Sequence, residues 1–293
     1  MSTENKTQPT ANESIICPVC NQALKRTDKQ FCCENNHQFD VAKQGYVNLL
    51  QPQHKKSKQP GDSQEMVEAR FRFLNEAYYE PLSDKLNQLI AKDLSNRIPE
   101  DNAYNVVDAG SGEGYYTQRL YEHLNHSVRP YIIGFDISQR AVKASCRRSK
   151  SIQWMTATSS HIPVASHSQD AVVCLFSRIV PDEFSRILKK DGILYVASTG
   201  SSHLIELRNM LYQNVKQSAY NPDSALSDHF TSLDESLNAN VRYKIEVNSQ
   251  QAINDLLLMT PHYWRATESA KQAIQSMDSI SVTVDIHLTG YRL

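Results

Sequence analysis

The sequence predicts an α/β protein with a mostly parallel sheet of seven strands, preceded by a small N-terminal metal-binding module. Two observations carry this prediction. From residue 64 onward, short and continuously apolar strands alternate with amphipathic helices, a pattern typical of a parallel sheet with helices on both faces. The first 33 residues hold four of the six cysteines, at spacings that suit a metal-binding knuckle.

Composition and charge narrow the class of protein. No run of about 18 apolar residues occurs, so we expect no transmembrane helix. Residues 1–14 are polar and lack the apolar stretch of a secretory signal, so we expect a disordered lead and a cytoplasmic protein. The net charge of −1 gives the whole chain no general attraction for nucleic acid. Locally, Cys17–Pro60 carries seven Lys and Arg against three Asp and Glu, a net +4 that suits a polyanion.

Three regions follow the lead. Residues 15–50 are rich in cysteine, 51–63 form a basic linker with two prolines and a glycine, and 64–293 hold the long helices and strands. Asp62 with Glu65 resembles a capping arrangement that starts a helix, and Pro81 predicts the start of a second helix.

The remaining elements follow from apolar periodicity. We expect strands at 105–110, 131–136, 152–157, 170–176, 192–198, 241–247 and 280–288, and helices at 115–124, 139–148, 182–189, 203–216 and 249–259. Residues 217–240 are polar and irregular, which predicts a loop or a mobile insertion.

A glycine cluster predicts where a ligand binds. Gly110, Gly112 and Gly114 are three of only nine glycines, and they lie between a strand and a helix, where doubly wound sheets bind ligands. Glycine lets the backbone pass close to a ligand, so ligand contact is the favoured explanation and a simple tight turn the alternative. The spacing differs from the dehydrogenase G-x-G-x-x-G, and the carboxylates of Asp108 and Glu113 favour a cationic sulfonium and ammonium over a pyrophosphate.

Asp136 ends the following strand. This position suits a carboxylate that accepts both ribose hydroxyls of an adenosine, although Asp136 as a helix N-cap is an alternative.

The cysteine spacing predicts a closed structural zinc site. Cys17 and Cys20 form a C-x2-C knuckle, and Cys33 with His37 supplies a second pair. Cys32 is a rival for the third ligand position, and a redox C-x-x-C is the alternative interpretation. Such a site does no chemistry itself but folds a segment that is too small to bury a core.

The glycine loop and Asp136 resemble the class I S-adenosylmethionine-dependent methyltransferases. The whole chain from about residue 15 resembles the bacterial 23S rRNA guanine-N1 methyltransferases, on the segments CPVC, CENNHQFDVAKQGYVNLL, KSKQPGDSQEMVEAR, DAGSGEGYYT, HLIELR and LLLMTPHYWRA. This resemblance implies a Rossmann-like methyltransferase fold, S-adenosylmethionine as cofactor and structural Zn²⁺. It is strongest for the Gram-negative branch, which implies methylation of nucleotide 745 in hairpin 35; a sister branch modifies nucleotide 748.

The resemblance also implies roles for particular residues. It assigns the zinc ligands, which favours Cys33 over Cys32, and places Asp108 and Gly110 in the first cofactor motif. The implied zinc ligands are Cys17, Cys20, Cys33 and His37, and the implied cofactor contacts are Tyr79, Gly112, Glu113, Asp136 and His203. Family members form dimers with a shared RNA cleft, so a homodimer is expected from the resemblance alone.

One position departs from the family pattern. Arg178 stands where a proline is expected, in a segment near the target base, so it is either a new contact to a base or phosphate or a surface substitution. Guanine N1 carries a proton at neutral pH, so transfer needs a base or an anion-stabilising donor, but the sequence assigns no catalytic residue.

The RNA contacts remain hypotheses at this level. Tyr115, Tyr116 and Phe176 are candidates to stack on a looped-out base, and Lys55, Lys56 and Lys58 to contact phosphates. Two other functions stay open: a small-molecule methyltransferase, and an RNA-binding protein that retains the cofactor fold without turnover.

Overall fold

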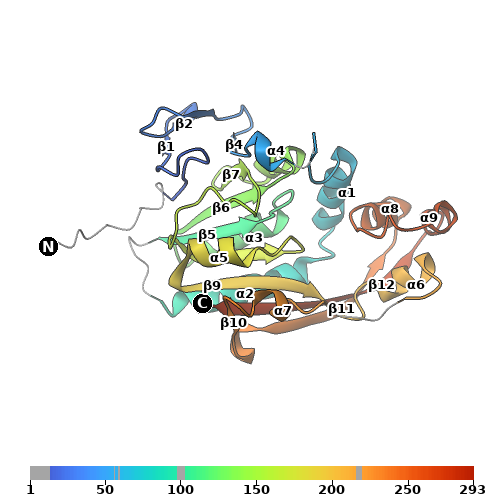
Figure 1. Ribbon diagram of the computed structural model, residues 1–293. Coiled ribbons are helices and arrows are strands. Elements are labelled where there is room, and N and C mark those ends of the chain that lie inside the picture. Colours follow the sequence, from blue (N-terminus) through green and yellow to red (C-terminus); the bar gives the residue numbers. More distant parts are fainter. Residues whose placement is uncertain (1–13, 56, 59, 98–102, 216–219) are drawn as a thin grey trace.

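Continuous apolar segments of the sequence form the central strands of one large sheet, with helices on both faces (Figure 1). The computed structural model describes residues 14–55, 57–58, 60–97, 103–215 and 220–293. The predicted disordered lead therefore lies outside the described residues except for Ser14, which is fully buried. The carbonyl of Ser14 accepts the N–H of Ala165 at 2.8 Å, so Ser14 belongs to the folded protein.

All seven strands that the sequence predicts are present in this sheet. They are β5 (Tyr104–Ala109), β6 (Pro130–Asp136), β7 (Gln153–Thr156), β8 (Gln169–Leu175), β9 (Leu188–Thr199), β11 (Ala239–Val247) and β12 (Ile280–Arg292).

Two short strands complete the sheet. Within the described residues, β4 (Val47–Asn48) and β10 (Thr231–Ser232) raise the number to nine, in the order β10-β12-β9-β8-β5-β6-β7-β4 with β11 beside β12. Neighbouring strands from β4 to β9 are parallel, whereas β10, β11 and β12 pair antiparallel. The mostly parallel α/β class is therefore confirmed.

Burial on both faces explains why the central strands are continuously apolar. Val106 and Val107, neighbours in β5, belong to two different apolar clusters, one on each side of the sheet. Because successive side chains of a strand point to opposite faces, each must be apolar where helices cover both faces.

Nine α-helices surround the sheet within the described residues. They are α1 (Gln64–Asn75), α2 (Glu80–Ser95), α3 (Tyr115–Leu124), α4 (Gln139–Arg148), α5 (Pro181–Ile187), α6 (Ile205–Leu211), α7 (Asp223–Leu226), α8 (Gln250–Leu258) and α9 (Glu268–Gln275). Among these described helices, none has both the length and the apolar character that crossing a membrane requires.

Several boundaries differ from the prediction. Helix α5 ends at Ile187 because β9 begins at the next residue, and the helix expected at 203–216 is only α6. The described part of the expected loop 217–240 holds α7, β10 and a 3-10 turn, and α9 has no predicted counterpart.

The capping residue of α1 also differs. Ser63, and not Asp62, caps the helix, because its Oγ accepts the N–H of Met66 at 3.2 Å. This leaves the Asp62 carboxylate available for an ion pair elsewhere.

The N-terminal module packs against one edge of the large sheet (Figure 1). Three short antiparallel strands, β1 (Lys25–Arg26), β2 (Gln30–Cys32) and β3 (Gln38–Asp40), form its own sheet. The following strand β4 pairs in parallel with β7, and buried Leu24 and Phe31 belong to the same apolar cluster as the sheet. The module and the larger domain therefore share a core.

Candidate active site and zinc centre

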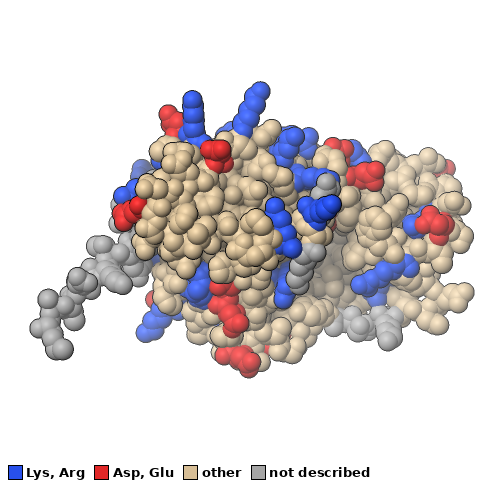
Figure 2. Space-filling view, turned by 45° about the horizontal axis from the view of Figure 1, so that its top comes forward, with Lys and Arg blue, Asp and Glu red and all other residues tan. Residues whose placement is uncertain are grey.

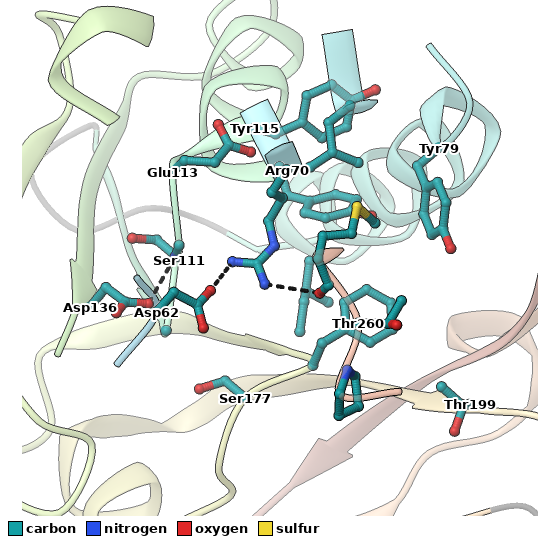
Figure 3. Close-up of a pocket in the computed structure, with 18 of the residues that line it drawn as sticks. Asp62, Arg70, Tyr79, Ser111, Glu113, Tyr115, Asp136, Ser177, Thr199 and Thr260 are labelled. Atoms are coloured by element: carbon teal, nitrogen blue, oxygen red, sulfur yellow. Dashed lines mark hydrogen bonds and ion pairs between the residues drawn. The ribbon is translucent and has the colours of Figure 1, made fainter. Parts of the chain in front are cut away.

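A cavity of about 670 Å³ opens at the carboxyl ends of the parallel strands (Figure 3). Ligand pockets in proteins commonly have about 300–1,000 Å³, so this one is large enough for a cofactor and part of a substrate. Six of the seven cofactor residues that the sequence analysis names lie in its wall: Tyr79, Gly110, Gly112, Glu113, Asp136 and His203.

Asp108 is the residue of that set outside the cavity wall. It is buried on β5, where its Oδ2 accepts the hydroxyl of Thr117 at 2.6 Å. Burial raises the pKa of Asp108 to about 7. Its observed contact therefore ties the strand to α3, beneath the glycine loop.

The glycine loop has left-handed backbone at all three glycines, with φ of 86° at Gly110, 57° at Gly112 and 87° at Gly114. A Cβ at Gly110 would lie 2.0 Å from Oγ of Ser177, and one at Gly114 would lie 2.8 Å from the Trp154 ring. Contacts within the protein therefore already require glycine at these two positions. A Cβ at Gly112 meets only the Arg70 guanidinium, at 3.7 Å, so Gly112 is the position that keeps the cavity open.

Asp136 connects this loop to the next helix. Its Oδ2 accepts the N–H of Gly112 at 3.0 Å, and its Oδ1 accepts the N–H of Ser138 at 2.7 Å. Burial raises the pKa of Asp136, which the two amides oppose. The N-cap of α4 is Ser138, whose Oγ accepts the N–H of Ala141, so the alternative of Asp136 as N-cap is wrong.

Glu113 lies in the cavity wall and forms an ion pair with Arg148. Both side chains are almost fully buried, and burial raises the pKa of Glu113 while Arg148 opposes that shift. Arg148 also donates to Asn75 at 2.9 Å and lies over the Phe71 ring. The pair therefore joins the start of α3, the end of α4 and α1.

Arg70 was missed by sequence reasoning. It pairs with Asp62 and donates through Nη2 to the carbonyl of Met259 at 3.3 Å; Figure 3 shows both contacts as dashed lines. One guanidinium thus joins the linker, α1 and the segment 259–262, which lines the cavity. Met259 lies 189 residues from Arg70 in the chain, so no local pattern predicts that contact.

Tyr79 and His203 line the cavity as expected. Tyr79 is buried and packs edge-on against Phe73, with ring centroids 6.0 Å apart. His203 accepts the backbone N–H of Asp285 on Nδ1 at 3.3 Å. Burial lowers the pKa of His203 to about 4, so the imidazole is neutral at pH 7.

The segment after β8 forms part of the cavity edge. Phe176 and Ser177 line it, and Phe176 is 49% exposed with a left-handed φ of 54°. The Phe176 ring lies 6.3 Å from that of Tyr116. Arg178 is exposed and is not part of the cavity wall. Tyr115 is buried beneath Arg148, so of the three aromatic candidates Phe176 is the most accessible.

The predicted zinc ligands converge. One ligand atom from each of Cys17, Cys20, Cys33 and His37 lies within 4.8 Å of the others. Sγ of Cys20 is 3.7 Å from Sγ of Cys33, close to the ~3.8 Å that two zinc-bound thiolates span in a tetrahedron. The Sγ of Cys32 instead donates to the carbonyl of Cys33 at 3.3 Å. The four residues therefore fit a closed structural zinc site.

Comparisons with known proteins match both parts of the chain. A zinc-ribbon family model described as RlmA, N-terminal matches residues 15–58, and one described as Methyltransferase domain matches residues 84–257.

Relatives match over nearly the full length. YxjB of Bacillus subtilis (strain 168), assigned to the 23S rRNA (guanine-N(1)-)-methyltransferases, is 30% identical over 93% of this chain and 94% of its own. A protein of Micromonospora griseorubida with the same assignment is 30% identical over 95% of this chain and 97% of its own. The 23S rRNA (guanine(748)-N(1))-methyltransferase of Streptomyces fradiae is 32% identical over 67% of each chain.

These matches span the zinc ribbon, the linker and the sheet that holds the cavity. The chain therefore belongs to the family of 23S rRNA (guanine-N1)-methyltransferases, which joins a zinc ribbon to a class I S-adenosylmethionine-dependent methyltransferase domain.

Proposed function

We propose that this protein transfers the methyl group of S-adenosylmethionine to N1 of guanine 745 in hairpin 35 of 23S rRNA. The observation that carries the proposal is the 670 Å³ cavity, which brings the glycine loop and Asp136 together with the accessible ring of Phe176. One end is suited to a nucleoside cofactor and the other to an aromatic base. The family relatives named for 23S rRNA support this choice of substrate.

The chain's own residues would hold the cofactor, which supplies a methyl group on a cationic sulfonium when bound. Each oxygen of Asp136 accepts one amide N–H and has a further lone pair for a ribose hydroxyl. Gly112 leaves space beside this carboxylate. Tyr79, Glu113 and His203 complete the wall. The buried ion pair with Arg148 compensates the charge of Glu113, so Glu113 serves here to position the glycine loop.

The target guanine must leave its stack to reach the cavity, because N1 is buried in any Watson–Crick pair. Phe176 presents an exposed ring at the cavity edge, where a looped-out base can stack. Base–aromatic stacking contributes about 1–3 kcal/mol in nucleic-acid complexes, enough to offset part of the unstacking cost.

Guanine N1 must also lose its proton. His203 does not suit that task, because its Nδ1 already accepts an N–H and its low pKa disfavours the cation. In the neutral ring the proton is on Nε2, so we propose that His203 donates a hydrogen bond into the cavity. This hydrogen bond would stabilise negative charge on a ligand in the cavity.

Basic residues near the N-terminal module suit the RNA backbone. Figure 2 shows more Lys and Arg than Asp and Glu over this part of the surface. Lys55 and Lys58 are exposed, and Lys56 lies outside the described residues. We also propose that the protein works in the cytoplasm and that it forms a homodimer. Sedimentation with and without RNA would test the oligomeric state.

The decisive experiment combines the protein with labelled S-adenosylmethionine and 23S rRNA that lacks its native modification. N1-methylguanine blocks base pairing, so it stops reverse transcriptase and reports its own position. A stop at nucleotide 745 is the expected result. A stop at 748 would overturn the proposed nucleotide and keep the enzyme class.

The remaining outcomes separate the alternative functions. Cofactor and RNA binding without label transfer would indicate an RNA-binding protein that lacks turnover. Label transfer to small molecules, with none to RNA, would indicate a small-molecule methyltransferase. Heat-denatured protein gives the background.

A further inference from the structure

Beside the cofactor cavity lies a smaller hollow of about 130 Å³, whose described lining shares only Ile137 with the cavity wall. The ends of β4 and β7, the basic linker and the first turn of α4 form its walls. At roughly 30 Å³ per water, it has room for about four waters, or for one phosphate group with part of its hydration.

The charge of the hollow is positive. Lys55, Lys58 and Arg140 line it, and among the described residues no acidic side chain does. The N-terminus of α4, a helix of ten residues capped by Ser138, also faces the hollow. The first turn of a helix carries N–H groups without intrahelical acceptors and the positive end of the helix dipole, so both features favour an anion.

Thr156 provides independent evidence for a polar ligand. It lines the hollow at the end of β7 and is only 1% exposed, yet its Oγ1 has no hydrogen-bond partner among the described residues. A buried hydroxyl without a partner costs stability, so such a group in a polar hollow points to a missing ligand. Asn48 adds a donor, because its Oδ1 accepts the N–H of Leu50 and its NH₂ group remains.

The hollow is coupled to the cofactor cavity. Ile137 lines both, and the linker passes between them where Gly61 contacts Ser138 so closely that a Cβ would lie 2.7 Å away. Ser138 also donates its N–H to Asp136 and its hydroxyl to the carbonyl of Asp62, at 2.7 Å and 3.0 Å. A group bound in the hollow is therefore held against the wall of the cofactor cavity.

We propose that this hollow is a phosphate site that holds one backbone phosphate of the RNA substrate, with Lys55, Lys58, Arg140 and Thr156 as its ligands. The inference rests on the proposed function for the source of the phosphate. A phosphate fixed here sets the register of the RNA strand relative to the cavity, since backbone contacts position a nucleic acid without reading its sequence.

Two variants of the full-length protein test the site. Lys55→Ala with Lys58→Ala removes charge, and Thr156→Val removes only the hydroxyl. Lys190→Ala is the matched control, because this exposed lysine lies near the start of β9, at the opposite end of the parallel strands. Filter binding of unmodified 23S rRNA at several KCl concentrations gives the dissociation constant and its salt dependence, and calorimetry gives the affinity for S-adenosylmethionine.

The double lysine variant should weaken RNA binding roughly tenfold and flatten its salt dependence by about one to two ion equivalents. Thr156→Val should weaken RNA binding severalfold while its melting temperature stays equal or rises, because a buried hydroxyl without a partner is removed. A purely structural role would not produce these opposite changes. Cofactor affinity should stay within about twofold.

An unchanged RNA affinity and salt slope in both variants, with wild-type methylation intact, would overturn the phosphate site alone. If wild-type protein neither binds nor methylates rRNA, the proposed function fails. The binding of inorganic phosphate then tests whether the hollow is an anion site. Calorimetric binding of inorganic phosphate to wild type at fixed ionic strength, lost in Thr156→Val, would support an anion site for free phosphate. Absence of phosphate binding in wild type would then overturn the site itself.

Discussion

The carboxylate of Asp136 accepts the backbone N–H of Gly112 at 3.0 Å, which joins the end of β6 to the loop that follows β5. The two strands are neighbours in the sheet, with Asp108 opposite Gly134. This one contact therefore fixes the loop conformation and aims a carboxylate into the cavity at the same time.

Replacement of Asp136 by Ala should weaken S-adenosylmethionine binding roughly 100-fold, because the two proposed hydrogen bonds to ribose hydroxyls and the acceptor for Gly112 would be lost together. Asp136→Asn keeps one acceptor, so a loss of roughly tenfold is expected. Calorimetry measures the S-adenosylmethionine affinity of both variants. Asp191→Ala, an exposed residue near the start of β9, serves as control. Wild-type affinity in Asp136→Ala would contradict the ribose assignment.

Asp108 should make stability depend on pH. Burial raises its folded-state pKa to about 7, whereas an unfolded Asp titrates near about 3.9. Between these values the folded state binds more protons than the unfolded state, so the free energy of unfolding falls as pH rises through this window. Asp108→Asn keeps an acceptor for Thr117 and removes this dependence.

Urea unfolding at pH 5 and pH 8 measures the effect. The stability of Asp108→Asn relative to wild type should increase by about 2 kcal/mol between the two pH values. A difference that stays constant with pH would show that Asp108 has an ordinary pKa in the folded protein.

Local signals explain which parts of the fold could be predicted. Helices α3 and α4 match their predicted ranges because left-handed Gly114 precedes one and the Ser138 cap starts the other. Strands β5 and β8 were predictable because burial on both faces favours apolar side chains in succession, as in Val106–Val107 and Ala171–Leu175. Helix α9 escaped prediction because it has only eight residues, of which Lys271 and Ile274 are buried, and this is shorter than the window over which helical periodicity stands out.

The cavity could be predicted only in part. Residues of the glycine loop and Asp136 follow strand ends, so sequence order places them at one edge of the sheet. The contact of Arg70 with Met259 depends on the packing of α1 against α8. Most of the chain separates these two helices in the sequence. No local pattern carries that information. Likewise, spacing alone left Cys32 and Cys33 as rivals, and the fold separates them by directing their sulfurs apart.

The zinc site predicts different outcomes for these adjacent cysteines. Cys33→Ser should lose the metal from a site that holds about one zinc ion per chain, since Cys33 is one of four convergent ligands. Cys32→Ser should retain it, because its sulfur is directed to a backbone carbonyl. Elemental analysis of dialysed protein measures the zinc content. Equal zinc loss in both variants would contradict the ligand set.

Loss of zinc should also destabilise the larger domain. The module shares a core with the sheet, and β4 pairs with β7, so metal removal should lower the melting temperature of the whole protein. An unchanged melting temperature after chelation would indicate that the module unfolds independently.

Phe176 combines exposure with backbone strain. It holds a left-handed φ of 54°, which costs an L-residue about 1–2 kcal/mol, and the residue is 49% exposed at the cavity edge. A strained and exposed residue at a cavity edge is a sign of function, and stacking on the target base is the function that suits an exposed aromatic residue here.

Phe176→Ala should therefore lower kcat/KM for rRNA by roughly 30-fold, with S-adenosylmethionine affinity unchanged. Phe176→Gly should be equally impaired but about 1 kcal/mol more stable than the Ala variant, because glycine adopts the left-handed conformation without strain. Primer extension and urea unfolding measure the two effects. Full activity in both variants would show that the ring does not contact the base, and equal stability would show that position 176 carries no strain.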